Sequence, residues 1–156
     1  MTSADSFPRK TPRITTSTEL RGVSLADLGM LFVRDGLPPM DPSKLATALE
    51  HSLLVVVARQ LKSRQLAGFV RLYGDGVFHL CACDLTIDPN LPNRGSLCRL
   101  LFDRLDSEIR VRYPRCSLTI FARALDYPHL QALGFSEKGN NVVAMSLPAT
   151  TAIAQW

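Results

Sequence analysis

The chain has 156 residues, of which 46% are hydrophobic and 21% are charged, and its formal net charge is +4 at pH 7. This length fits one domain with one hydrophobic core, and the composition is ordinary for a folded globular protein. No apolar run approaches the roughly 20 residues that span a bilayer, so we expect no membrane span. The four cysteines, at positions 81, 83, 98 and 116, lack a paired C-x-x-C spacing. Reduced thiols, and therefore a reducing compartment such as the cytoplasm, are expected.

Residues 1–18 are rich in Ser, Thr, Pro and basic residues, and we predict a flexible tail there. The hydroxyl-rich, acid-poor composition also has some character of a transit peptide, which makes the plastid stroma an alternative location. Basic residues gather in this tail and in the segment 94–115, but no aromatic residues alternate with them. This pattern does not favour nucleic acid as a partner.

The first half of the chain is predicted to form two helices and a meander. Residues 19–23 are expected to be a first strand, and Ser24 is expected to cap a helix that carries Leu25, Leu28, Leu31 and Phe32. Asp41 followed by Pro42 indicates a second helix start, because Asp caps free N–H groups and Pro is tolerated at the first helical position. Three antiparallel strands are predicted next, at 53–59, 65–73 and 77–88.

The stretch from Asp84 to Leu105 is predicted to be a strand, a loop and a helix. Apolar residues repeat every fourth position from Leu97 to Ile109, and Pro114 stops the pattern. We expect the helix to begin at Gly95. Free N–H groups at a helix start, together with the helix dipole, favour an anion such as phosphate. An ordinary βα turn that binds nothing is the alternative.

The remaining segments complete a mixed α/β fold. A strand at 116–122 after the helix implies a right-handed crossover and a parallel strand pair. A short helix at 125–133 closed by Gly134, a last strand at 142–147 and a C-terminal tail at 148–156 are expected. We predict a single domain, residues 19–147, with about six or seven strands and four helices.

The order of elements, the loop and the Leu133-Gly134-Phe135 corner together resemble the GNAT superfamily of acetyl-CoA-dependent N-acetyltransferases. The residues that match the family's loop pattern are Asp84, Ile87, Pro89, Arg94 and Gly95. Three upstream stretches are similar to a cyanobacterial and plastid subgroup: Gly36-Leu37-Pro38, Asp41-Pro42-x-Lys44-Leu45 and Gly68-Phe69-x-Arg71.

The resemblance implies a cosubstrate and a reaction. Acetyl-CoA would be bound, with its pyrophosphate held at the helix start, and acetyl would be transferred to a primary amine of a small arylalkylamine, a protein lysine or a protein N-terminus. A protein partner or a homodimer stays open. The residues implied in cofactor binding are Ile87, Asn93, Arg94, Gly95, Ser96, Leu97 and Arg99.

Three positions depart from the family pattern. Pro92 stands where Gln or Arg usually opens the loop, and Leu97 stands where a small residue is usual. Leu130 stands where most members carry the Tyr that protonates the departing thiolate. A catalytically silent binding or regulatory subunit with the same fold is therefore the alternative function.

Three other residues are the candidates for proton transfer. Asp84 could relay a proton through water, and its alternative is a cap or an ion pair with a nearby Arg. Tyr127 or His129 could replace the missing acid, and an exposed structural role is the alternative for each. We expect no metal site on the predicted strand 77–88, because its same-face His and Cys side chains lie roughly 7 Å apart and a fourth ligand is missing.

Overall fold

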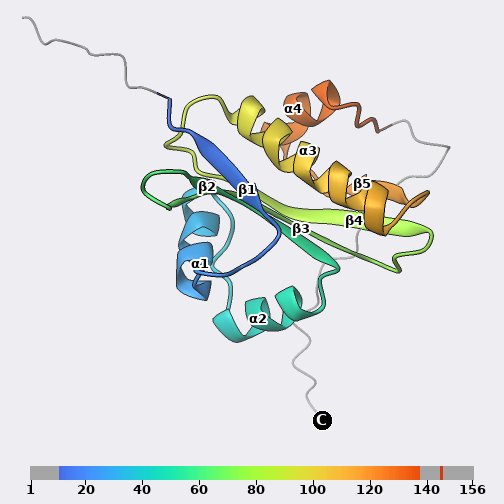
Figure 1. The fold of residues 1–156 in the computed structure, drawn as a ribbon, viewed down its shortest axis with the longest axis horizontal. Helices are drawn as coiled ribbons and strands as arrows, with labels where there is room; N and C mark the ends of the chain where they lie inside the picture. Colours follow the sequence, from blue (N-terminus) through green and yellow to red (C-terminus); the bar gives the residue numbers. More distant parts are fainter. Residues whose placement is uncertain (1–10, 138–144, 146–156) are drawn as a thin grey trace, which may run out of the picture.

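A five-stranded mixed sheet lies between helices on its two faces (Figure 1), in a computed structural model that describes residues 11–137 and 145. The strands, in the order of both sequence and sheet, are β1 (Ile14–Ser17), β2 (Leu54–Gln60), β3 (Leu66–Gly74), β4 (His79–Ile87) and β5 (Ser117–Ile120). The helices are α1 (Leu25–Arg34), α2 (Pro42–Glu50), α3 (Arg94–Arg112) and α4 (Tyr127–Ala132), with a 3₁₀ turn at Ala124–Asp126.

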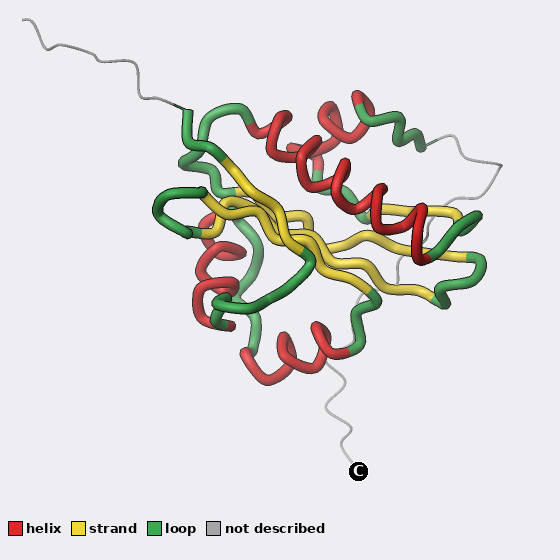
Figure 2. The backbone as a smooth tube through the Cα atoms, viewed as in Figure 1, coloured by secondary structure: helices red, strands yellow, loops and turns green. Residues whose placement is uncertain are grey.

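The topology confirms the predicted mixed α/β class. Strands β1 to β4 pair antiparallel in sequence order, and β5 pairs parallel with β4 after the α3 crossover. Figure 2 shows the strands as one continuous layer with α3 and α4 on one side and α1 and α2 on the other. The sheet has five strands in the described residues, below the expected six or seven. The predicted strand at 142–147 and tail at 148–156 lie outside the described residues, except for Met145.

The prediction of the first strand was wrong. Residues 19–23 form a turn, in which the Val23 N–H donates to the Leu20 carbonyl at 2.9 Å and Gly22 has a φ of +74°. The strand is β1, which lies within the segment predicted to be a tail. Its β-branched residues suit a strand, and the partly buried Ile14 packs against the core. The first strand of the sheet therefore lies earlier in the chain than expected.

The helix starts at Ser24 and Asp41 are confirmed. The Ser24 hydroxyl accepts a hydrogen bond from the Asp27 N–H at 3.0 Å, and Asp41 Oδ1 accepts from the Ser43 N–H at 2.8 Å. Each cap satisfies a backbone donor that the helix cannot pair. In residues 11–137, no helix combines the length and the apolar character that crossing a bilayer requires.

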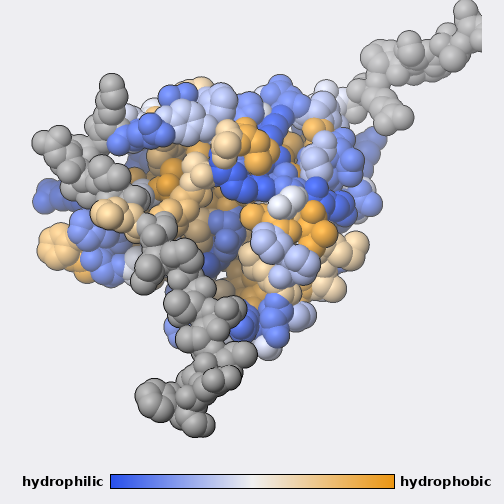
Figure 3. Space-filling model, turned by 180° about the vertical axis from the view of Figure 1, so that it is seen from behind, coloured by the Kyte–Doolittle hydropathy of each residue, from blue (hydrophilic) through white to orange (hydrophobic). Residues whose placement is uncertain are grey.

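The sheet separates two apolar clusters. On one face, Phe32 of α1 meets Phe69 of β3 edge-on, with ring centroids 5.5 Å apart. On the other face, α3 buries its fourth-position repeat against the sheet, and Phe135 packs edge-on against Phe102. The Leu133-Gly134-Phe135 corner thus returns to the core as expected. Hydrophobic residues also reach the surface between hydrophilic ones, as Figure 3 shows from behind.

Gly29 in the middle of α1 offers a stabilising substitution. A Cβ built there meets no atom within 4 Å, and the residue does not have a positive φ. Because Gly loses more backbone freedom than Ala in a helix, Gly29→Ala is expected to raise the free energy of unfolding by about 0.5–1 kcal/mol. Urea denaturation measures the change. A destabilised Gly29→Ala variant would show that the space beside α1 is filled.

Candidate functional site

Strands β4 and β5 stay paired along only part of β4. Their register runs from His79 beside Ser117 to Ala82 beside Ile120, and the Phe121 N–H then donates to the Ala82 carbonyl at 3.3 Å. Strand β4 continues to Ile87 without a strand paired on that side in the described residues. An open strand edge of this kind can pair with an extended ligand that carries amide groups.

A β-bulge in β4 determines where Asp84 lies. Phe69 is opposite Thr86 and Arg71 is opposite Cys83, so two residues of β4 face the single Val70 of β3. Strict alternation would direct Asp84 into the core with Leu80 and Ala82. The bulge, with a φ of +55° at Asp84, turns its carboxylate to the opposite face.

On that face Asp84 forms an ion pair with Arg71. The Arg71 Nε donates to Asp84 Oδ2 at 2.5 Å, and about a fifth of each side chain is exposed, 19% and 22%. The same guanidinium lies 5.7 Å from the centroid of the Tyr73 ring. The structure therefore contains an ion pair between Asp84 and a nearby Arg, which was the alternative expected for this residue. A proton relay through Asp84 stays a prediction.

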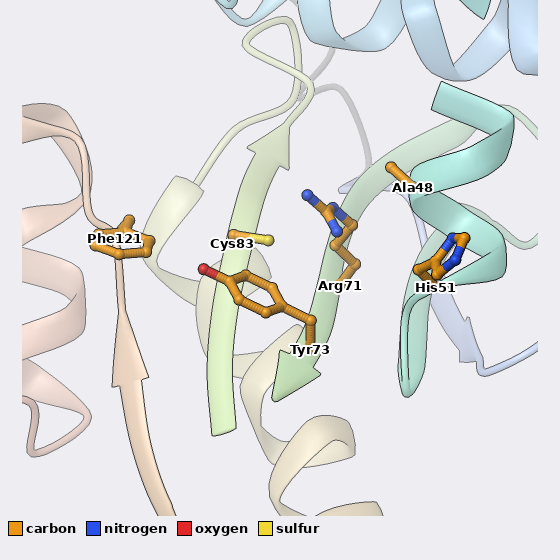
Figure 4. A pocket seen from close by; sticks show the side chains of 6 residues that line it. All are labelled: Ala48, His51, Arg71, Tyr73, Cys83 and Phe121. Atoms are coloured by element: carbon orange, nitrogen blue, oxygen red, sulfur yellow. The ribbon is translucent and has the colours of Figure 1, made fainter. Parts of the chain in front are cut away.

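A cavity of about 430 Å³ opens beside this ion pair. Its lining comes from α2, from neighbouring positions of β3 and β4 and from the residue after β5 (Figure 4). The lining residues are Ala48, His51, Arg71, Tyr73, Cys83 and Phe121. Burial is the main cause that raises the pKa of the Cys83 thiol to about 12, so this thiol stays protonated at neutral pH. The sequence pattern singled out none of these residues for a cavity, and Arg71 entered only through the Gly68-Phe69-x-Arg71 similarity.

The loop after β4 ends at a helix start that can receive an anion. Asn93 has a left-handed backbone, with a φ of +63°, and its side chain caps α3 by accepting from the Ser96 N–H at 3.1 Å. Helix α3 begins at Arg94, one residue before the expected start. Within the described residues, the backbone N–H groups of Arg94 and Gly95 meet no hydrogen-bond acceptor. These two donors are available to a phosphate.

The Arg94 side chain is directed into a buried ion-pair network and not into the loop. Its guanidinium donates to Asp35 at 2.6 Å and to Asp126 at 2.7 Å, and both carboxylates are at most 2% exposed. Arg123 contacts both acids as well. Burial alone would raise the pKa of Asp35, but hydrogen bonds from Arg94, the Ile87 N–H and Arg123 hold it below its usual value.

This network joins the end of α1, the end of β4, the start of α3 and the 3₁₀ turn. Sequence reasoning missed Asp35, Arg123 and Asp126, because nothing in the local pattern marks a contact across 59 or 88 positions. The network holds the two ends of the loop that connects β4 to α3.

The other residues implied in cofactor binding divide into three groups. Ile87 is buried, its N–H donates to Asp35 at 2.9 Å, and its carbonyl accepts from Arg94 at 3.3 Å. Leu97 is 5% exposed and packs in the core, so its side chain does not occupy the loop. Ser96 and Arg99 are exposed on the first turns of α3.

Leu130 and the two candidate acids near it, Tyr127 and His129, do not line the cavity. Leu130 is 2% exposed and belongs to the core. A hydrogen bond to Glu137 is the main cause that raises the pKa of Tyr127. The His129 ring packs against the start of α3, where a Cβ on Gly95 would lie 2.9 Å from His129 Nδ1. Glycine at position 95 therefore makes room for the His129 imidazole.

Known proteins with related sequences are plastid acetyltransferases. The GCN5-related N-acetyltransferase 1, chloroplastic, of Arabidopsis thaliana is 27% identical over 124 residues, which are 80% of this chain and 62% of that protein. The serotonin N-acetyltransferase 2, chloroplastic, of Oryza sativa subsp. japonica is 32% identical over 91 residues, 57% of this chain and 45% of that protein. The chain thus spans less than two thirds of either relative. No protein-family model matches it.

Solved structures share the fold. A GNAT-family acetyltransferase of Streptococcus pneumoniae superposes with a TM-score of 0.66 at 20% identity, covering 88% of this chain and 98% of that one. An Escherichia coli GNAT family N-acetyltransferase in complex with CoA superposes with a TM-score of 0.59 at 17% identity, covering 76% and 68%. The related sequences are N-acetyltransferases and the mixed sheet with a helix start after β4 is the fold of GNAT-family acetyltransferases, so both comparisons support the resemblance to the GNAT superfamily.

Proposed function

We propose that this protein transfers acetyl from acetyl-CoA to a primary amine. One observation carries the proposal: among the described residues, the backbone N–H groups of Arg94 and Gly95 at the start of α3 meet no acceptor, and the edge of β4 has no strand partner beyond Ala82. A pyrophosphate would be bound by the helix start and an extended pantetheine arm would run along the open strand edge. The thioester would then lie where β4 and β5 diverge, beside the cavity.

The cavity favours an amine with an apolar or aromatic body. Phe121 and Ala48 supply apolar lining, and the Asp84 carboxylate lies next to the lining residue Arg71. An arylalkylamine is the first acceptor to test, since one relative is a serotonin N-acetyltransferase, and a protein lysine or N-terminus is the second. Asp84 would take the proton that the attacking amine loses, through water.

A reducing compartment fits this proposal. All four cysteines are free thiols, at positions 81, 83, 98 and 116. The cytoplasm is the proposed location, with the plastid stroma as the alternative that the two chloroplastic relatives support. A homodimer or another protein partner belongs to the same proposal and is tested by the mass of the protein in solution.

Gly95→Asp is expected to weaken acetyl-CoA binding by at least about tenfold, which corresponds to 1.4 kcal/mol. The new carboxylate would repel the pyrophosphate at the helix start, and its Cβ would lie 2.9 Å from His129 Nδ1. Calorimetric titration with acetyl-CoA measures the dissociation constant.

Two controls separate charge from crowding. Gly95→Ala keeps the added Cβ without the charge and is expected to lose less affinity. Gly29→Asp adds the same charge on α1, where a Cβ meets no atom within 4 Å. Wild-type affinity in Gly95→Asp would show that the loop does not hold the phosphates.

A second candidate is a catalytically silent binding subunit. The specific observation in its favour is that the position of the usual acid is a buried Leu130, 2% exposed, in the core. Pro92, which has no N–H group, also removes one donor from the loop. Acetyl-CoA binding without acetyl transfer to serotonin, tryptamine or a lysine peptide would support the silent subunit. Absence of binding at millimolar acetyl-CoA would exclude both candidates.

A further inference from the structure

The proposed reaction needs an acid that the usual position cannot supply. When the C–S bond of the thioester breaks, the departing thiolate has to be protonated. Leu130 has no proton to give and is buried in the core. Tyr127 is engaged with Glu137, and His129 packs against Gly95 at the start of α3, on the phosphate side of the site. The acid that protonates the thiolate would therefore have to be a hydroxyl that lies nearer to the cavity.

Tyr73 brings such a hydroxyl to the cavity from a different strand. It belongs to β3, lines the cavity of about 430 Å³ and is 37% exposed. Figure 4 shows its ring extending from β3 over β4, with the hydroxyl directed to the side on which Phe121 follows β5. This is the side on which β4 and β5 diverge after Ala82 and Ile120.

Neighbouring side chains hold the Tyr73 ring in this position. The Arg71 guanidinium lies 5.7 Å from the ring centroid and is itself held by Asp84 at 2.5 Å. The ion pair and the aromatic ring thus form one unit, in which a cation lies near the π-face of the ring.

We propose that Tyr73 is the catalytic acid of the acetyl transfer, replacing the tyrosine that is absent at position 130. The inference rests on the proposed function. The amine nitrogen attacks the thioester carbonyl carbon, the C–S bond breaks, and its electron pair leaves on sulfur. The thiolate takes the proton of the Tyr73 hydroxyl and becomes the CoA thiol. The amine nitrogen loses one proton through Asp84 and water, and the tyrosinate is reprotonated from solvent.

Tyr73 carries its proton at neutral pH, as a proton donor has to. A hydrogen bond with Cys81 is the main cause that raises the pKa of Tyr73 to about 12, and burial and nearby thiols add to it. The phenol is therefore protonated across the neutral range, and its raised pKa makes it a weaker acid than an unperturbed tyrosine.

Tyr73→Phe tests the proposal, because it removes one oxygen and keeps the ring beside Arg71. With acetyl-CoA and serotonin as substrates, we expect kcat to fall by about 10² or more, with the KM for acetyl-CoA and its calorimetric dissociation constant within about twofold of wild type. Tyr113→Phe is the matched control. Its hydroxyl donates to the Leu53 carbonyl at 3.4 Å, away from the cavity, and its removal is expected to leave kcat unchanged.

Chemical rescue separates a proton donor from a structural ring. In Tyr73→Ala, added phenol is expected to restore part of kcat, whereas anisole, which has a similar shape and no donor, is not. Wild-type kcat in Tyr73→Phe, or equal rescue by phenol and anisole, would overturn the proposal and leave the proposed function standing. A wild-type protein that binds acetyl-CoA and acetylates neither serotonin nor a lysine peptide would overturn both.

Discussion

Replacing Asp35 with alanine is expected to lower the free energy of unfolding by about 3–5 kcal/mol, because it leaves two partly buried guanidinium groups, those of Arg94 and Arg123, with Asp126 as their one remaining partner among the described carboxylates. The Asp35 side chain is 2% exposed and accepts from Arg94 at 2.6 Å and from Arg123 at 2.5 Å. It also accepts from the Ile87 N–H at 2.9 Å, which the substitution would leave unpaired. Urea denaturation followed by circular dichroism measures the loss.

Asp106→Ala is the matched control for Asp35→Ala. Asp106 accepts from Arg110 at 2.7 Å, but the two side chains are 57% and 78% exposed. An exposed pair of this kind contributes at most about 1 kcal/mol. Similar losses of unfolding free energy in Asp35→Ala and Asp106→Ala would show that the effect comes from ion pairing in general. They would contradict a specific role of the Asp35 network in supporting the loop.

The same network predicts a loss of stability in acid. The pKa of Asp35 is lower in the folded protein than its usual value of 3.8, owing to the hydrogen bonds that overcome its burial. Its contribution is therefore complete above the unfolded pKa and is lost as the pH falls through the folded pKa. Denaturation curves from pH 6 to pH 2 should converge for wild type and Asp35→Asn at the acid end. A constant difference between the two would contradict this assignment.

Leu97→Ala is expected to cost about 2–5 kcal/mol of unfolding free energy without improving acetyl-CoA binding. Leu97 stands where a small residue is usual in the family, and on sequence alone it could crowd the ligand. In the structure it is 5% exposed and packs with the core of α3. Thermal and urea denaturation measure stability, and calorimetry on the folded variant measures affinity.

Val111→Ala on the same helix is the control for Leu97→Ala. Val111 is 81% exposed, so its truncation is expected to change stability by less than about 0.5 kcal/mol. A tighter dissociation constant for acetyl-CoA in Leu97→Ala would show that the leucine side chain does obstruct the loop.

Local patterns predicted most of the fold. Some signals depend only on neighbouring residues, and they indicate helices and turns without any knowledge of the tertiary structure. They include the caps Ser24 and Asp41, the fourth-position repeat of α3 and the turn glycines. The first strand was missed because β1 is short and is stabilised by pairing with β2, more than 35 positions away in sequence. Such pairing leaves little local signal.

The site was only partly predictable, since its side chains depend on distant contacts. The loop and Gly95 follow from the sequence, but the direction of the Arg94 side chain depends on Asp35 and Asp126. Asp84 faces the cavity side only because of a bulge, which alternation along the strand does not reveal. The sequence did not indicate Tyr73 as a candidate, because its position over β4 depends on how two strands pair, and no sequence motif records that pairing.

Release of CoA thiol from acetyl-CoA in the presence of an amine is the most direct test of the central claim. With the full chain, acetyl-CoA and serotonin or tryptamine, the account predicts thiol release that depends on the amine and matches the acetylated product by mass spectrometry. The rate should fall in Gly95→Asp. Binding of acetyl-CoA with no amine-dependent thiol release, for these amines and for a lysine peptide, would contradict the account.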